Sequence, residues 1–344
     1  MATERLMSPA TLPTEIDQPA NALRPTRIDE YIGQRDLIER LSIAIQAGRQ
    51  REDPMEHVLL HGPPGLGKTT LAHVIANEMG SKVHATSGPA LARGTDLVAT
   101  LTRLEANDVL FIDEIHRLPV AVEEFIYPAM EDFRIDVTID SGLHAQTVQI
   151  NCKPFTLIGA TTRAGLLSSP LRSRFGLVHH LRYYDSRDLH KILMRSSGIL
   201  GMPSPPESAM TLIAERSRGT PRIANRLLRR VRDYADVRAQ GEVSNDIVER
   251  ALELEGIDHL GLDELDRAYL GTIATTYEGG PVGLEAVAAT MNQDVGTLED
   301  VIEPFLLQNG FLARTRRGRM LTRAAAEHLG VSAPAAVETD SIFD

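Results

Sequence analysis

The chain has 344 residues, of which 42% are hydrophobic and only 4% aromatic, so its length predicts two or three domains and its composition favours an aliphatic α/β protein. Its formal net charge of −11 argues against a surface that is basic throughout, so any contact with DNA requires a local basic patch. The single cysteine, Cys152, excludes an internal disulfide framework, and the chain lacks a long apolar run or a signal-peptide pattern, so we expect a soluble cytoplasmic protein with no membrane contact.

The first part of the chain predicts an arm, a helix and a strand. Residues 1–22 are rich in Pro, Thr and Ala and predict a loosely ordered arm. Residues 36–47 have apolar side chains four apart at Leu37, Leu41 and Ile45, which predicts a helix. The apolar run over residues 58–60 then predicts a buried strand.

A phosphate-binding pattern, G-x-x-x-x-G-K-[ST], follows this strand over residues 62–69 and precedes a predicted helix over residues 71–78. Glycines let the backbone approach a polyphosphate, and the amides at the helix start point at it. Lys68 would reach the β- and γ-phosphates and Thr69 would bind Mg²⁺, whereas the alternative is a plain glycine-rich turn. The residues expected to hold the nucleotide here are Gly65, Gly67, Lys68, Thr69 and Thr70.

Two acids end a second predicted strand, over residues 109–112. Ligands in parallel sheets bind outside the carboxyl ends of the strands, so we expect Asp113 and Glu114 on the strand that neighbours the phosphate loop. Asp113 would then hold Mg²⁺ with Thr69, and Glu114 would activate the attacking water, although two acids that merely cap a strand are the alternative. His116 has no ligand partner at i+4 and is interpreted as an ordinary histidine.

A hairpin is predicted over residues 133–150, because residues 133–139 alternate apolar and polar side chains, Asp140–Gly142 can turn, and residues 147–150 continue the pattern. The hairpin interrupts the core between two buried strands, so we expect it to protrude. A structural edge hairpin and a probe for a partner or for DNA both remain open.

A third buried strand is predicted over residues 155–160, and it ends in Thr161 and Thr162. Either hydroxyl could bind the γ-phosphate or the attacking water. The loop that follows contains Arg172 and Arg174, and arginines at such a loop can stabilise transition-state charge, although solvated surface arginines are the alternative. Arg222 stands at the start of an amphipathic helix and can point back across a cleft.

The pattern changes beyond residue 256. Helices are predicted over residues 262–276 and 284–291, and a third begins near Thr297, which indicates a helix-turn-helix unit. Two short strands then flank a turn at residues 316–318, which completes a winged helix.

The local basic patch lies in this wing. Residues 310–323 contain five arginines and no acidic residue, whereas the helix in the recognition position carries Glu299, Asp300 and Glu303, which we expect to repel phosphates. We therefore predict that the wing rather than the helix grips the DNA backbone without reading bases, with a merely soluble hairpin as the alternative. The five arginines are Arg314, Arg316, Arg317, Arg319 and Arg323.

The order of these motifs resembles that of the AAA+ ATPases. The stretches 113–117, 159–165, 183–185 and 218–233 more closely resemble the RuvB family of bacterial Holliday-junction branch-migration motors, and the resemblance covers about residues 20–330. It implies a parallel-sheet AAA+ ATPase domain over 23–184, a small helical lid over 185–256 and a winged-helix domain over 257–330, with a disordered tail over 331–344.

The family resemblance also implies an activity and partners. It implies a homo-hexameric ring that hydrolyses ATP with Mg²⁺ and pumps duplex DNA through four-way junctions in recombination and in repair, including the SOS response to DNA damage. It further implies a junction-binding partner, RuvA, that docks on the hairpin near residues 133–150, and the resolvase RuvC.

The resemblance implies roles for individual residues. Arg174 would be the arginine finger for a neighbouring subunit's site, with Arg172 a weaker candidate, and Arg222 would be the second sensor. The nucleotide would also be approached by Leu23, Arg24, Glu131, Asp132, Phe133 and Tyr184, and DNA by Arg314 and Arg319. Arg316 departs from the family pattern, in which proline is usual. We expect other arginines of the helix after Arg222, such as Arg226, Arg229 and Arg230, to lie on a solvated face.

Two other classes of protein fit parts of the sequence. A winged-helix AAA+ loader of the origin-initiator type would use ATP as a binding switch, without sustained turnover. A nonenzymatic DNA-binding regulator with a degenerate ATPase domain is the other alternative, and the intact Lys68, Thr69, Asp113 and Glu114 argue against it.

Overall fold

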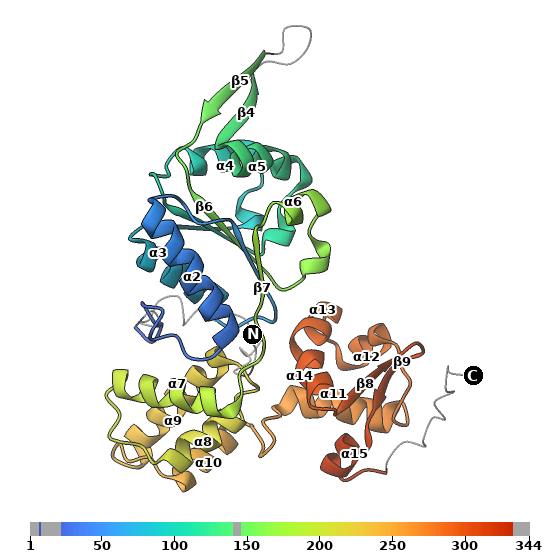
Figure 1. Ribbon diagram of the computed structural model, residues 1–344. Helices are drawn as coiled ribbons and strands as arrows, with labels where there is room; N and C mark the ends of the chain where they lie inside the picture. Colours follow the sequence, from blue (N-terminus) through green and yellow to red (C-terminus); the bar gives the residue numbers. More distant parts are fainter. Residues whose placement is uncertain (1–6, 8–21, 140–145, 333–344) are drawn as a thin grey trace, which may run out of the picture. The chain divides into compact units, whose positions relative to one another are not determined.

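The computed structural model describes residues 7, 22–139 and 146–332 (Figure 1). Within them, residues 22–192 and 220–222 belong to one compact unit, and residues 193–219 and 223–332 belong to a second. Residues 1–6 and 8–21 of the predicted arm, the turn at Asp140–Gly142 and the tail from residue 333 lie outside the described residues. In the described part, no helix is both long and apolar enough to cross a bilayer.

The first unit is built on a five-stranded parallel sheet in the order β2-β3-β6-β1-β7. Its strands are β1 (Val58–His61), β2 (Val83–Ser87), β3 (Val109–Asp113), β6 (Thr156–Thr161) and β7 (Leu177–His180). The three predicted strands are confirmed. We did not predict β2 and β7, because these short strands carry histidines and half-buried side chains instead of a continuous apolar run.

The sheet order corrects one expectation. β6 pairs with both β1 and β3, so β3 is not adjacent to the strand that leads into the phosphate loop. The carboxyl ends of β1 and β6 are nevertheless in register, with His61 opposite Thr161. The polar residues that end β3 and β6 therefore share one edge of the sheet with the phosphate loop.

Helices cover both faces of this sheet. α3 (Lys68–Met79) packs on one face with α2 (Arg35–Arg51) against it, and α4 (Gly94–Leu101) packs with α5 (Val120–Asp132) in the core of the other face. Leu59, Leu110 and Leu157 belong to the α4–α5 core, so their strand neighbours face α3, because side chains alternate along a strand. Cys152 packs half-buried against this core, and burial raises the pKa of its thiol, which is consistent with a structural role.

The protruding hairpin is confirmed. β4 (Arg134–Ile139) and β5 (Gln146–Asn151) pair antiparallel, with Ile135 opposite Ile150, and Figure 1 shows them extending from the end of α5 away from the parallel sheet. Ile135 is buried in the α4–α5 core and anchors the base of the hairpin.

The second unit contains the lid helices. α7 (Ser186–Ile199) begins in the first unit and ends in the second, which continues with α8 (Glu207–Glu215), α9 (Pro221–Arg238) and α10 (Asn245–Leu254). Ile223, Leu227 and Val231 form the buried face of α9, as its periodicity predicts. The prediction of a solvated face for Arg226 is wrong: the side chain is buried, because that residue lies beside the apolar stripe and not opposite it.

The winged helix is confirmed in the same unit. Its elements are α11 (Glu264–Thr276), α12 (Leu284–Met291), α13 (Val295–Thr297), a π-helical turn (Leu298–Ile302), α14 (Glu303–Gln308), β8 (Leu312–Thr315), β9 (Gly318–Leu321) and α15 (Arg323–Leu329). The third helix begins at Val295, two residues before the predicted start near Thr297, and the Asp294 side chain caps it by accepting from the Thr297 backbone N–H. In the wing, a Cβ on Gly318 would lie 2.3 Å from the Val282 carbonyl oxygen, so this close approach requires glycine.

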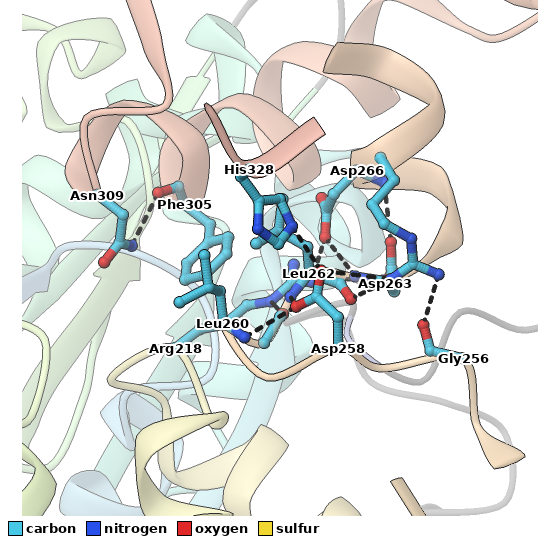
Figure 2. Close-up of polar contacts among 12 residues, drawn as sticks. Arg218, Gly256, Asp258, Leu260, Leu262, Asp263, Asp266, Phe305, Asn309 and His328 are labelled. Carbon is cyan, nitrogen blue, oxygen red and sulfur yellow. Dashed lines mark hydrogen bonds and ion pairs between the residues drawn. The ribbon is translucent and has the colours of Figure 1, made fainter. Parts of the chain in front are cut away.

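A buried arginine joins the lid to the winged helix within this unit (Figure 2). Arg218 comes from the loop before α9, and its Nε–H donates to the Gly261 carbonyl oxygen at 3.0 Å. The same guanidinium pairs with the fully buried carboxylate of Asp266 and lies 4.3 Å from the centre of the Phe305 ring. Nearby, the His328 ring bonds the Asp258 carboxylate at 2.9 Å. Polar and stacking contacts thus connect the lid loop to α11 and α14, and the segment before α11 to α15.

Candidate nucleotide site and DNA-binding wing

The phosphate loop joins β1 to α3, and three of its glycines have positive φ angles: 137° at Gly62, 79° at Gly65 and 98° at Gly67. A Cβ on Gly62 would lie 2.4 Å from the Leu181 carbonyl oxygen, and one on Gly67 would lie 2.9 Å from the Tyr31 hydroxyl. Only glycine fits both positions. The backbone therefore forms a cradle of amides at the start of α3, where phosphate oxygens can be held.

Lys68 points back over this cradle. The side chain is buried, and its Nζ donates to the carbonyl oxygens of Gly62 and Pro63, at 2.8 Å each. Burial lowers the pKa of Lys68 to about 8; the Asp113 carboxylate opposes this shift and the Arg222 guanidinium adds to it. A bound polyphosphate would supply the negative charge that this buried ammonium lacks.

The two acids at the end of β3 have different surroundings. Asp113 accepts a hydrogen bond from the Glu114 backbone N–H at 2.9 Å, and its negative charge acts on Lys68 by raising the pKa of that ammonium. Glu114 has a left-handed backbone, with φ 47°, and its carboxylate pairs with Arg117 at 3.0 Å. Thr69 and Asp113 offer the hydroxyl and carboxylate oxygens that Mg²⁺ prefers, so these residues fit a cation that shares its other ligands with phosphates and water.

The two threonines at the end of β6, Thr161 and Thr162, are not equivalent. Thr161 is buried, its Oγ1 bonds the His116 ring Nδ1 at 2.9 Å, and it accepts from the Arg163 backbone N–H at 3.0 Å. Thr162 is exposed. The hydroxyl of Thr161 thus ties the end of β6 to the segment after β3, while the side chain of Thr162 is the one accessible from solvent. His116 is part of this tie, which agrees with its interpretation as an ordinary histidine.

Aromatic residues support the phosphate loop from the N-terminal segment and from the end of the sheet. The Tyr184 hydroxyl donates to the Tyr31 oxygen at 3.2 Å and to the Leu66 carbonyl at 3.4 Å. Burial raises the pKa of Tyr31 to about 12, so its hydroxyl stays neutral. We did not predict Tyr31 from sequence; the only local signal is a tyrosine next to the Ile32-Gly33 turn in a chain poor in aromatics.

Three further predicted residues lie in the same unit. The Arg222 backbone N–H donates to the Gly65 carbonyl oxygen at 3.4 Å, so the start of α9 touches the phosphate loop. Leu23 is buried. Burial lowers the pKa of His73 on α3, and the charge of Arg24 lowers it further. Arg24 therefore lies near the helix that follows the loop.

Arg174 is held by a set of contacts at the ends of α5 and α6 (Ser169–Ser173). Its Nη2 pairs with the Glu131 carboxylate at 3.1 Å, its Nη1–H donates to the Pro170 carbonyl oxygen at 2.8 Å, and its guanidinium lies 4.3 Å from the centre of the Tyr127 ring. The Tyr127 hydroxyl in turn donates to the buried Glu123 carboxylate at 2.7 Å. We did not predict Tyr127 and Glu123, because nothing in the local sequence marks them.

Other predicted residues lie close by. Asp132 pairs with Arg134 at 3.2 Å, and Phe133 packs edge-on against Phe155, with ring centres 5.9 Å apart. Of these three predicted residues, Glu131 forms the ion pair with Arg174, and Asp132 and Phe133 follow it directly in the chain. Arg172 is exposed.

The wing brings Arg314 and Arg319 together, because they are directly opposite on β8 and β9. Both guanidinium groups pair with the carboxylate of Glu303. Our prediction that Glu303 repels phosphates is therefore wrong: the residue is fully buried, since α14 turns this carboxylate inward beneath the wing. Glu299 is 43% exposed, and its carboxylate lies 3.7 Å from Arg314.

A parallel sheet with a phosphate loop at its carboxyl edge, two acids and a polar strand end, followed in the chain by a helical lid, defines a P-loop protein of the AAA+ class, here with a C-terminal winged helix. Family models agree along the chain: the Holliday junction DNA helicase RuvB P-loop domain matches residues 23–181, the RuvB AAA lid domain 184–258 and the RuvB C-terminal winged helix domain 259–330. The chain belongs to the RuvB family.

Solved structures of a relative match almost the whole chain. The Thermotoga maritima RuvB Holliday junction branch migration motor is 50% identical, with a TM-score of 0.83, and the match covers 91% of this chain and 100% of that one. A variant of the same protein is 51% identical over 91% of this chain and 99% of that one, again with a TM-score of 0.83.

Proposed function

We propose that this protein is an ATP-hydrolysing ring motor that drives branch migration of Holliday junctions by moving duplex DNA. The observation that carries the proposal is the convergence of Lys68, Asp113 and Arg222 at the phosphate loop. Two of these residues belong to the sheet domain, and the third begins a lid helix, so the state of the nucleotide can bias the lid. The printed name of the Thermotoga relative, a branch migration motor, supports the same activity.

Each step of hydrolysis has a candidate residue. The loop amides and Lys68 would bind the β- and γ-phosphates, while Thr69 and Asp113 would hold Mg²⁺, which neutralises phosphate charge. Glu114 would release Arg117 and accept a proton from the attacking water. We assign the sensor role to Thr162, because the hydroxyl of Thr161 is engaged inside the fold.

Arg174 would stabilise the transition state in a neighbouring subunit. The ion pair with Glu131 supports a shared role, so Glu131, Asp132 and Phe133 belong to the same subunit surface in this proposal. A heterologous contact of this kind closes into a ring, and the family implies six subunits. In this proposal, the sheet domain ends at residue 184 and the lid at residue 256. The β4–β5 hairpin is the docking site of a RuvA-type partner, and RuvC is the resolvase.

The direct test is ATP-dependent movement of a synthetic four-way junction, with and without a junction-binding partner. Mixing Arg174→Ala with Lys68→Ala subunits should restore part of the ATP turnover that each variant lacks. In mixed rings, some sites combine the intact Lys68 of an Arg174→Ala subunit with the intact Arg174 of a neighbouring Lys68→Ala subunit. An Arg172→Ala variant serves as the matched control and should retain turnover alone. Complete absence of complementation would overturn the shared site.

Glu114→Gln separates the motor from its alternatives. In a motor, this variant should bind ATP and lose steady-state turnover together with junction movement. A loader that uses ATP as a switch would bind ATP without sustained turnover even in the wild type. A regulator with a degenerate ATPase domain would keep its function in the Gln variant.

A further inference from the structure

One buried carboxylate beneath the wing, that of Glu303, gathers donors from three elements. Arg319 donates to it from Nε at 2.8 Å and from Nη2 at 3.3 Å, and Arg314 donates from Nε at 2.9 Å and also from Nη2. The Tyr269 hydroxyl of α11 donates at 2.6 Å. Both oxygens of Glu303 therefore accept more than one hydrogen bond, although the residue is 0% exposed.

The carboxylate is ionised in this setting. Burial by itself raises the pKa of Glu303, but the hydrogen bonds from Arg319, Tyr269 and Arg314 outweigh that effect, so its pKa lies below the usual value. The hydrogen bond to Glu303 also raises the pKa of Arg319. One buried negative charge thus sits between two permanent positive charges, so Glu303, Arg314 and Arg319 together carry one net positive charge, which the half-exposed Glu299, 3.7 Å from Arg314, offsets from the side.

The geometry directs both arginines outward. A guanidinium is planar, with donors around its rim, and both arginines present the Nε–Nη2 edge to Glu303. The opposite edge, which carries Nη1, therefore points away from the buried carboxylate. Arg314 is 43% exposed and Arg319 is 19% exposed, so the pair lies at the surface of the wing.

Without the carboxylate, this arrangement would not hold. Arg314 and Arg319 are a direct cross-strand pair, and like charges directly opposite each other repel. Two long side chains would then adopt many rotamers, and ordering them again on a ligand would cost binding free energy.

We propose that Glu303 is a positioning residue that holds Arg314 and Arg319 side by side to receive the phosphates of duplex DNA. The inference rests on the proposed DNA contact of the wing and names a residue that acts through those two arginines. Charge alone would predict that removing a negative charge next to a DNA-binding surface strengthens DNA binding. The positioning role predicts the opposite, that loss of Glu303 weakens DNA binding.

The test measures binding of duplex DNA to the full-length Glu303→Gln variant. Fluorescence anisotropy reports this binding at several salt concentrations and for unrelated DNA sequences. We expect binding about tenfold weaker than wild type and a flatter salt dependence, because two phosphate contacts lose their order. Glu299→Gln is the matched control, since it removes the same charge from a half-exposed residue next to Arg314 and should bind DNA as tightly as wild type or more tightly. Thermal unfolding monitors the fold of each variant.

Three outcomes would overturn the inference. If Arg314→Ala/Arg319→Ala binds DNA like wild type, the proposed wing contact fails, and the role of Glu303 fails with it. If that variant is weak but Glu303→Gln binds as tightly as wild type, the wing contact stands and only the positioning role is overturned. A further loss when Glu303→Gln is added to the double arginine variant would indicate an effect on the whole domain.

A second variant covers the case in which Glu303→Gln fails to fold. Glu303→Asp keeps the charge but shortens the side chain, so it can no longer reach both guanidinium groups. Because the net charge is unchanged, weaker DNA binding by this variant reports on position alone, and binding equal to wild type overturns the proposal.

Discussion

Nucleotide affinity should fall steeply at mildly alkaline pH, because burial lowers the pKa of Lys68 to about 8. The triphosphate binds the charged ammonium of Lys68, so at a pH above this pKa nucleotide binding must take up a proton. The affinity for nucleotide is therefore at its maximum below the pKa and falls as the pH rises through the pKa. With a pKa of about 8, the charged fraction of Lys68 falls from about 0.76 at pH 7.5 to about 0.09 at pH 9.0, so the affinity for ATP should fall about eightfold. A lysine with its ordinary pKa near 10.4 would change it by only a few per cent over this range.

Equilibrium binding of a fluorescent ATP analogue at the two pH values measures this effect. Both values lie above the second pKa of phosphate, near 6, so the ligand changes little. Lys68→Arg is the matched control, because a guanidinium stays charged throughout and its affinity should be flat whatever its absolute value. Equal pH dependence in the wild type and the Arg variant, or no dependence in the wild type, would refute the assignment.

Three other predictions concern residues outside the phosphate loop. Tyr127→Leu removes the ring beneath Arg174 and should lower ATP turnover about three- to tenfold in steady-state assays, whereas Tyr127→Phe keeps the ring and should stay near wild type; equal loss in both would contradict the stacking role. Arg218→Leu leaves the Asp266 carboxylate buried without that cation and should cost about 3–5 kcal/mol of unfolding free energy in calorimetry, against less than about 1 kcal/mol for Arg230→Leu, which breaks an exposed pair. Arg314→Ala should weaken binding equally for unrelated DNA sequences and reduce the salt slope by about one; a sequence-selective loss would argue against backbone recognition.

Local patterns predicted the elements that depend on nearby residues. The phosphate loop is readable because its glycines, lysine and threonine must be at fixed spacing for the backbone to curve around an anion. The strands β1, β3 and β6 were readable as apolar runs, since both faces of the sheet are covered. The wing was readable from its glycine turn and its arginines. The short strands β2 and β7 were not predicted, because their side chains are mostly half-buried or exposed and include histidines, so they form no continuous apolar run.

The roles of individual side chains depended on the tertiary structure. Sequence placed Glu303 with the acids that repel DNA, but the packing of α14 buries it between Arg314 and Arg319. Sequence also could not separate Thr161 from Thr162, which differ only because one hydroxyl meets His116 inside the fold.

The sequence by itself predicted a sheet domain with a phosphate loop and a basic wing, because each is encoded by residues close together in the chain, whereas the helical lid was implied by the family resemblance. Only the tertiary structure decided that β6 separates β3 from β1 and that Tyr31 supports the phosphate loop. It also decided that Glu303 and the wing arginines form one cluster. Such contacts join residues far apart in sequence, and their partners are chosen by strand order, register and packing, which no local pattern encodes.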